Sequence, residues 1–320
     1  MNFNNTDGKT ICLVLGGRGF LGSHLIPALV RSGYKVRCFD RFKSIGVEEG
    51  FHPISDIEYI SGDIANEVEL TTAITGCDIC FHLISTTLPK SSNDDPIFDI
   101  ESNLISSVKL MSICVKAGVK KVIFTSSGGT VYGNSEKSFI DENQPTNPRS
   151  SYGITKLAIE KYLELYRIIY ALDYIVLRIA NPYGERQKIN SGQGAVTVFL
   201  NKVLNDEKVE IWGDGSVVRD YIYISDVVNA MVASCNYQGE ERVFNIGSGK
   251  GKSINQILNS IEIVTGLTVK RVYLPGRYFD SRSNVLSINL ADRHLHWKPK
   301  VDFNDGLRRC VDWLNAFKKK

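Results

Sequence analysis

A phenol and an ammonium group stand four residues apart in the stretch Tyr152-Gly-Ile-Thr-Lys156. On a helix, this spacing puts both side chains on one face. Such a pair suits proton transfer at an alcohol, because a neighbouring Lys⁺ favours the phenolate and moves the pKa of tyrosine from about 10 toward the working pH. We therefore predict that Tyr152 and Lys156 are catalytic; a solvated helix face is the alternative for this spacing taken alone.

A second group of residues could hold a dinucleotide. The stretch Gly16-Gly-Arg-Gly-Phe-Leu-Gly22 has glycine at positions 16, 19 and 22, a variant of the dinucleotide fingerprint. Glycine permits a tight turn with positive φ and lets backbone N–H groups at a helix N-terminus approach a pyrophosphate. Asp40 ends the next apolar run, where it can accept hydrogen bonds from the adenosine ribose, and its charge favours NAD over NADP. The adjacent Arg41 could instead accept a 2′-phosphate.

The elements that must position these residues alternate between short apolar runs and amphipathic stretches. The predicted strands are 11–15, 35–39, 57–60, 78–84, 121–125 and 173–179, and the predicted helices are 20–30, 68–74, 97–116 and 151–170. Strands separated by single helices indicate a parallel sheet that is covered on both faces. The predicted fold class is therefore α/β, with a Rossmann-like doubly wound sheet and a smaller C-terminal substrate-binding domain.

The domain boundary is not expected to be a single cut. Residues 1–178 are predicted to form the NAD-binding domain, and residues 179–320, which are richer in turns, mainly the smaller substrate-binding domain. A helix at 222–232 and a strand at 243–246 are expected to return to the main sheet. Ligands of open parallel sheets bind beyond the carboxyl ends of the strands, which is where the second domain would close.

Composition excludes several other classes of protein. The 320 residues contain 38 Lys and Arg against 35 Asp and Glu, so a net charge of +3 provides no field for binding nucleic acid. No apolar run approaches the ~20 residues that span a bilayer, and residues 1–10 lack the apolar core of a signal peptide, so a cytoplasmic location is expected. The seven cysteines are predicted to be reduced core thiols. Cys77 and Cys80 form a CxxC without a second pair at ligand spacing, so no metal site is expected.

Motifs along nearly the whole chain resemble those of the extended short-chain dehydrogenase/reductases, and among them the NAD-dependent nucleotide-sugar epimerase/dehydratase family. They lie at 16–24, 124–133, 152–156, 178–184 and 212–221, and Arg277 ahead of Trp297-Lys-Pro299 continues the similarity. The resemblance implies that NAD is the cofactor and a nucleoside diphosphate-sugar the substrate. The residues expected at the cofactor are Gly16, Gly19, Phe20, Leu21, Gly22, Asp40, Arg41, Asp63, Ile64, Tyr152 and Lys156; those expected at the substrate are Asn181, Arg219, Arg277 and Arg282.

Two of these assignments have an ordinary alternative. Asp63 suits the adenine amino group, but Gly-Asp is equally typical of a simple turn. Arg282 could pair with a C6 carboxylate of the sugar, or it could point to solvent as most loop arginines do. Asn284, two residues later, is expected to limit the room for an N-acetyl group.

The chain departs from the family at the active-site strand, where Gly128 occupies the usual Ser or Thr position. Ser127 is the first choice to supply the hydroxyl, through a local bulge at the two glycines, with Ser126 and Thr130 as alternatives. Family members that eliminate water carry an Asp-Glu pair after that hydroxyl, and related decarboxylases a Glu. Gly128 and Gly129 have no side chain that could serve elimination or decarboxylation, so the predicted chemistry is oxidation and reduction at C4 of the sugar.

The predicted activity is accordingly NAD-dependent 4-epimerisation of a UDP-sugar through a transient 4-keto intermediate, most simply between UDP-glucose and UDP-galactose. UDP-glucuronate and UDP-N-acetylglucosamine remain alternative substrates. An NAD(P)H-dependent reductase of a 4-keto-deoxysugar nucleotide is an alternative enzyme, and a dinucleotide-sensing regulator is the alternative without catalysis. The resemblance also implies a homodimer formed through the helices near 97–116 and 151–170.

Overall fold

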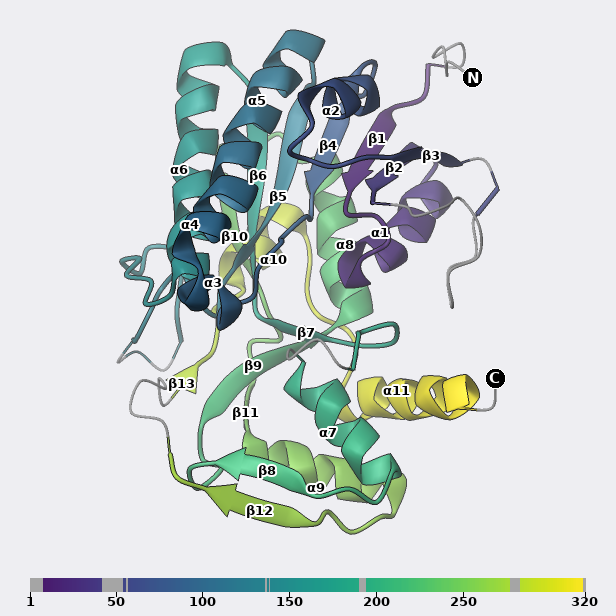
Figure 1. Ribbon diagram of the computed structural model, residues 1–320, viewed down its shortest axis with the longest axis vertical. Helices are drawn as coiled ribbons and strands as arrows, with labels where there is room; N and C mark the ends of the chain where they lie inside the picture. The colour runs from purple at the N-terminus through teal and green to yellow at the C-terminus, as the bar shows by residue number, and fades with distance from the viewer. Residues whose placement is uncertain are drawn as a thin grey trace.

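A seven-stranded, entirely parallel sheet forms the upper part of the molecule (Figure 1). The computed structural model describes residues 8–41, 54, 55, 57–135, 137, 139–189, 194–276 and 283–318. The strand order is β10-β6-β5-β4-β1-β2-β3. The strands are β1 (Ile11–Leu15), β2 (Lys35–Asp40), β3 (Ile57–Ser61), β4 (Ile79–His82), β5 (Lys121–Ser127), β6 (Asp173–Ile179) and β10 (Val243–Ile246).

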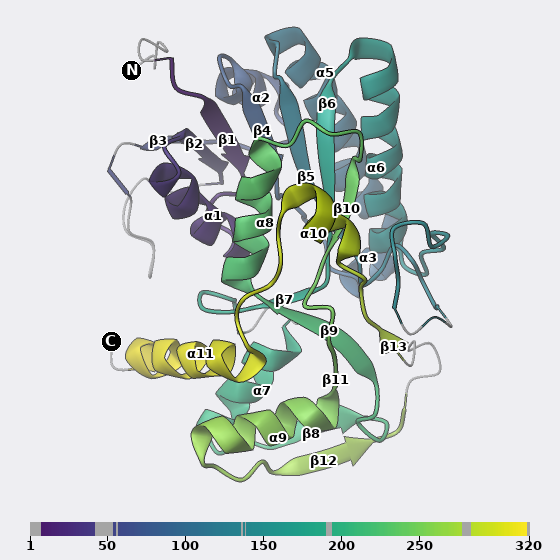
Figure 2. The ribbon, with the colours of Figure 1, turned by 180° about the vertical axis from the view of Figure 1, so that it is seen from behind.

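Both faces of this sheet are covered, because every side chain of β1 is buried and successive residues face opposite layers. Leu13 and Leu15 pack with α2 (Glu67–Ile74), α5 (Ser106–Ala117) and α6 (Ser151–Tyr170). Cys12 and Val14 belong to the core that contains α1 (Phe20–Arg31), α8 (Ile224–Cys235) and α10 (Asn289–Leu295). The two groups of helices lie in front of the sheet in Figure 1 and in Figure 2, respectively. The expected Rossmann-like α/β fold class is confirmed.

A smaller lobe lies beyond the carboxyl ends of the strands (Figure 1). A short sheet contains β9 (Val218–Tyr223), with β11 (Gly251–Ser253) and β13 (Ser283–Asn284) beside it and β7 (Asn181–Tyr183) also paired to it. A second pair joins β8 (Val209–Trp212) to β12 (Arg271–Leu274). The helices of this lobe are α7 (Ala195–Leu204), α9 (Ile254–Thr265) and α11 (Phe303–Lys318).

The chain passes between the two lobes several times. After β9 it returns to the upper sheet as α8 and β10, and β10 pairs with β6 along its whole length. After β13 the chain returns again as α10, and this helix packs beside β10 (Figure 2). Helix α10 was not predicted from the sequence. Within the described residues, no helix is both long and apolar enough to cross a membrane.

Two sequence predictions about local structure are corrected. The helix expected at 97–116 is broken into α4 (Pro96–Asp99), a π-helical segment η1 (Ile100–Ile105) and α5, preceded by the short α3 (Ser91–Asp94). The strand expected at 78–84 runs from Ile79 to His82; Leu83 still donates to the carbonyl of Leu15 at 3.2 Å, and Ile84 packs against Gly16.

Candidate active site

The glycine-rich turn after β1 closes tightly on itself. Gly16 has φ +82° and donates its N–H to the carbonyl of Phe39 at 2.9 Å. A Cβ on Gly22 would lie 2.4 Å from the carbonyl oxygen of Gly16, so only glycine lets α1 start this close to the turn. No side chain caps the N-terminus of α1, where Gly19 is the N-cap and Phe20 and Leu21 open the helix. The turn therefore offers uncapped N–H groups and an unobstructed surface, which fit the pyrophosphate of a dinucleotide.

The acidic end of β2 is fastened to this turn. Asp40 accepts hydrogen bonds from the backbone N–H groups of Arg18 and Arg41, both at 2.8 Å. Each carboxylate oxygen can accept a further hydrogen bond, so the group fits a pair of ribose hydroxyls. The side chain of Arg41 pairs with Asp63 at 2.8 Å, and both are substantially exposed. Ile64, which follows Asp63 in the chain, is buried in the core.

Tyr152 and Lys156 lie in the first turns of α6, as the spacing predicts. Lys156 Nζ donates a hydrogen bond to the carbonyl of Thr125 at 2.9 Å, which ties the ammonium to the end of β5. It also lies 4.7 Å from the centre of the Phe124 ring and 5.6 Å from that of Tyr152. The predicted pair is thus brought together with the hydroxyl-rich strand end.

The electrostatics of the pair differ from the expectation. Burial, with a further contribution from the charge of Asp99, raises the pKa of Tyr152 to about 12. Burial lowers the pKa of Lys156 to about 8, against the opposing effect of Asp99 and Glu160. The chain's own residues therefore do not lower the pKa of the phenol, because both burial and the charge of Asp99 raise it. A lowering of the pKa of Tyr152 would have to come from the positive nicotinamide ring of a bound cofactor.

The structure separates the three candidate hydroxyls. Ser126 points to the α6 side and donates to the buried carboxylate of Glu160. Ser127, the last residue of β5, is half-buried, and its neighbour Gly129 is exposed. The Oγ1 atom of Thr130 is buried without a hydrogen-bond partner among the described residues. Ser127 thus remains the first candidate and Thr130 the second.

The expected bulge at the two glycines is not present. Ser127 pairs in regular register with Ile179, and a turn follows in which Val131 donates to the carbonyl of Ser127 at 3.1 Å. Gly128 is glycine for a packing reason: a Cβ there would lie 2.5 Å from Cδ1 of Leu286. The chain from the smaller lobe occupies the space that a Ser or Thr side chain would need.

Those predicted substrate residues that the structure describes lie on the smaller lobe. Asn181 on β7 donates its amide to the carbonyl of Asp220 at 2.9 Å, and Arg219 is half-buried on β9. Asn284 pairs with Arg219 in the sheet and donates to the carbonyl of Gly128 at 3.2 Å. Its Oδ1 atom is buried without a partner among the described residues. Arg277 and Arg282 lie outside the described residues.

Three buried acidic residues near this site were not predicted from the sequence. Glu160 forms a two-oxygen ion pair with Arg178, at 2.6 to 3.2 Å. Asp220 accepts hydrogen bonds from Ser248, Gly249 and Leu286, and so holds β9 against the chain that covers Gly128. Asp99 bonds to α6. Of these three, only Glu160 could have been found from the sequence, because it continues the four-residue spacing of Tyr152 and Lys156 on one helix face.

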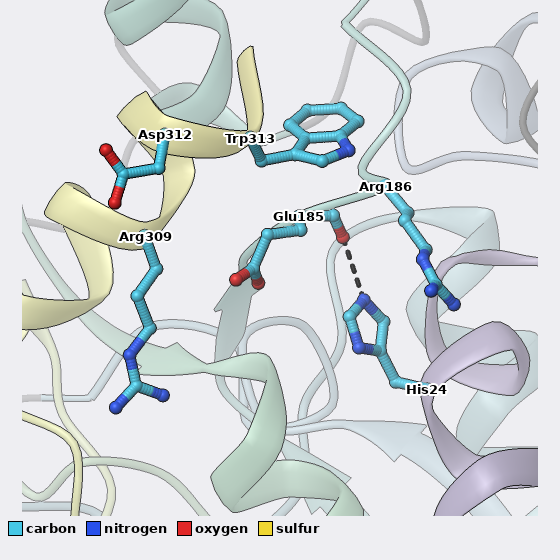
Figure 3. Close-up of a pocket in the computed structure, with 6 residues that line it drawn as sticks. All are labelled: His24, Glu185, Arg186, Arg309, Asp312 and Trp313. Atoms are coloured by element: carbon cyan, nitrogen blue, oxygen red, sulfur yellow. Dashed lines mark hydrogen bonds between the residues drawn. The ribbon is translucent and has the colours of Figure 1, made fainter. Parts of the chain in front are cut away.

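An open hollow of about 460 Å³ lies apart from this site, between α1, the turn after β7 and α11 (Figure 3). His24 donates from Nε2 to the carbonyl of Glu185 at 2.9 Å, and Arg186 donates to the carbonyl of Ser23 at the same distance. None of the predicted catalytic or cofactor residues lines this hollow. Its two hydrogen bonds instead tie α1, the helix of the glycine-rich turn, to the smaller lobe.

All seven cysteines are buried and unpaired, and no group of three or more His, Cys, Asp or Glu side chains within the described ranges could hold a metal ion.

Comparison with known proteins agrees with this geometry. The profile of a family described as the NAD dependent epimerase/dehydratase family matches residues 12–247. The chain is 35% identical over 307 residues to a UDP-glucose 4-epimerase from Mycolicibacterium smegmatis, covering 94% of this chain and 97% of that protein. It is 32% identical over 309 residues to a dTDP-4-dehydro-6-deoxyglucose reductase from Escherichia coli, covering 95% and 97%. The structure of a UDP-glucose 4-epimerase with UDP-glucose from Thermotoga maritima has a TM-score of 0.90 at 36% identity, covering 96% and 99%.

Proposed function

Because this chain belongs to the NAD-dependent epimerase/dehydratase family, we propose that it catalyses the 4-epimerisation of a UDP-hexose, in the simplest case between UDP-glucose and UDP-galactose. The observation that carries the proposal is the hydrogen bond that ties Lys156, beside Tyr152 on α6, to the end of β5, which is followed by two residues without side chains, Gly128 and Gly129. The site can move one proton at O4, but it lacks the second acid or base that elimination requires.

Each residue has a defined task in this proposal. Tyr152, as phenolate, takes the proton of the sugar O4 and later returns it. Lys156 stabilises the phenolate and holds the nicotinamide ribose, and Ser127 hydrogen-bonds O4. NAD, when bound, accepts a hydride from C4 and gives it back. The glycine-rich turn and Asp40 hold the two ends of the adenosine diphosphate half of that cofactor.

The smaller lobe is proposed to hold the substrate while the sugar exposes its other face. Arg219 and Arg277 would bind the diphosphate with forked donors, and Asn181 would contact the nucleotide-sugar. Asn284 is buried against Gly128, beside the proposed O4 site, so it leaves little room for a large substituent. This favours UDP-glucose over UDP-N-acetylglucosamine. Arg282 is the proposed partner of a carboxylate if UDP-glucuronate is the better substrate.

A mixing experiment separates the candidate activities. Purified protein is incubated with UDP-glucose and no added cofactor, and the products are resolved by chromatography. Formation of UDP-galactose is expected, because a hydride that is returned needs no external reductant. A requirement for NADPH or NADH with a 4-keto-deoxysugar nucleotide would instead assign the reductase activity of the Escherichia coli relative. A dinucleotide-sensing regulator would convert neither substrate.

Two further measurements refine the assignment. Denatured protein is expected to release NAD(H) rather than NADP(H), because of the charge of Asp40 and the pairing of Arg41 with Asp63. Values of kcat/KM for UDP-glucose, UDP-N-acetylglucosamine and UDP-glucuronate identify the sugar. A tenfold preference for the glucuronate corresponds to roughly 1.4 kcal/mol of transition-state preference. If Arg282→Ala leaves such a preference unchanged, Arg282 does not read the carboxylate.

The proposed partner is a second copy of this chain. Apolar side chains lie exposed on α4, η1 and α6, which pack together on one side of the molecule (Figure 1). They are Ile97, Phe98, Ile105, Ile154, Leu165, Ile168 and Ile169, and we call this surface the α4–α6 apolar face. In a two-fold dimer, the same face of each chain would cover the other. A cytoplasmic location remains part of this proposal.

A further inference from the structure

Asp99 is a fully buried carboxylate at the end of α4, outside every motif of the sequence analysis. Its Oδ1 accepts hydrogen bonds from Thr87 and Asn103, and its Oδ2 from Ser151 and Thr155, the last two at 2.7 Å. All four donors are uncharged side chains. Every polar atom of this carboxylate is thus hydrogen-bonded, although none of its donors is a cation.

These hydrogen bonds fasten the start of α6. Ser151 and Thr155 flank Tyr152, and Thr155 directly precedes Lys156. The backbone N–H of Tyr152 donates to the side chain of Ser92 at 3.0 Å, and that of Ser151 to the side chain of Asn93 at 2.9 Å. The segment from α3 to α4 thus fixes the helical turn that carries the proposed acid–base pair.

The charged and titratable groups that act on Lys156 come from three elements. Tyr152 and Glu160 lie on α6, Asp99 on α4 and His82 on β4. Burial, followed by the charge of Lys156, lowers the pKa of His82 to about 3, so this side chain is neutral. Glu160 also acts on Lys156, but it is paired with the cation Arg178 at 2.6 Å. Asp99 has no such cationic partner among its hydrogen-bond donors.

We propose that Asp99 is a positioning residue for the Tyr152–Lys156 pair: its carboxylate clamps the first turn of α6 through Ser151 and Thr155, the residues on either side of this pair's tyrosine and next to its lysine. The charge of Asp99 also acts on the buried ammonium, where it opposes the lowering of the pKa of Lys156 by burial. The effect of Asp99 on catalysis rests on the proposed function. Its effect on the pKa of Lys156 does not rest on that function, because this pKa can be measured in the folded chain without any substrate.

The charge is tested by NMR titration of the purified protein labelled with [ε-¹³C]lysine. The signal of Lys156 is identified by its loss in Lys156→Arg. Asp99→Asn keeps the size and most of the hydrogen bonds, since the four donors include three hydroxyl groups that can also accept. We expect the titration midpoint of Lys156 to fall by about one pH unit in this variant. The alkaline limb of the kcat profile should move in the same direction.

Two controls separate charge from structure. Glu101→Gln removes an exposed carboxylate on η1 and should leave the midpoint unchanged. Thr155→Val removes one clamp hydrogen bond but keeps the charge, so we expect kcat to fall about tenfold, with KM within twofold and no shift of the midpoint. Should Asp99→Asn not fold, Asp99→Ser makes the same prediction for the charge.

An unchanged Lys156 midpoint in the folded Asp99 variant would overturn the proposal, whatever the activity. So would a shift of equal size in Glu101→Gln. A shifted midpoint in a chain that does not epimerise UDP-sugars supports the role of Asp99 and contradicts the proposed function alone.

Discussion

Tyr152 is the residue on which the proposed reaction depends most directly. Its hydroxyl is the one group in the described site that can both take and return the proton of a sugar hydroxyl while Lys156 stabilises the charged form. Tyr152→Phe removes that oxygen and leaves the ring in place. We expect kcat to fall by roughly 10²–10⁴, while the variant stays folded and retains its cofactor. Conversion of UDP-glucose to UDP-galactose is the measurement.

Tyr162→Phe is the matched control, because Tyr162 is partly exposed on the same helix, ten residues further along. This variant should turn over normally. Near-normal turnover in Tyr152→Phe would show that another group is the base, despite the spacing from Lys156.

His82 is a buried histidine that must stay neutral in the folded chain. Its pKa is about 3, lowered from 6.5 by burial and then by Lys156. Between these two values the unfolded chain binds a proton that the folded chain does not, so stability is complete above pH 6.5 and is lost as the pH falls toward 3. From pH 7 to pH 5, this residue should remove about 2 kcal/mol from the free energy of unfolding.

Urea denaturation of the wild type and of His82→Gln at pH 7, 6 and 5 measures this effect. Glutamine can keep the hydrogen bond that joins His82 Nε2 to Ser107 at 2.8 Å, but it does not titrate. The variant should therefore lose less stability on acidification than the wild type. If the free energy of unfolding falls equally with pH in the two proteins, folding does not lower the pKa of His82.

Packing of the smaller lobe against the end of β5 explains Gly128 at the level of the elements. A Ser at this position is the usual family residue, but its Cβ would meet Leu286. Gly128→Ser should therefore destabilise the chain by roughly 1–3 kcal/mol, the usual cost of overpacking. Leu286→Ala creates room, so the double variant should be more stable than the sum of the two single effects predicts. Thermal or urea denaturation of the four proteins completes the cycle; strict additivity would contradict the steric explanation.

Elements built from local signals were predictable from the sequence. The amphipathic period of α6 and the apolar runs of β5 and β6 place Tyr152, Lys156 and Ser127 near one another without further information. The broken helix around η1 was not predictable, because its apolar spacing continues across the break. Nor were the position of Leu286 on Gly128 and the clamp at Asp99, since both join segments that are distant in the sequence.

At the scale of the whole molecule, the exposed α4–α6 apolar face predicts that two copies of the chain form a dimer. Ile168 is 75% exposed and lies on this face, so Ile168→Glu would place a charge in the proposed interface. We expect the wild type to sediment as a dimer and Ile168→Glu as a folded monomer. Ile263→Glu is the control, because Ile263 is similarly exposed, at 72%, but lies on α9 in the other lobe. A wild-type monomer, or a dimer that survives Ile168→Glu, would exclude this face.

The return of the chain to the upper sheet as α8 and β10 has a consequence for synthesis on the ribosome. The N-terminal part of a chain emerges first and can begin to fold while the rest is being made. Here, however, part of one sheet face stays bare until α8 has emerged, and β6 stays an unpaired edge until residue 246 has emerged. The nascent chain therefore carries an exposed strand edge and an apolar surface for the time needed to make β7, α7, β8 and β9 of the smaller lobe. Chaperone binding is expected to matter most during that interval.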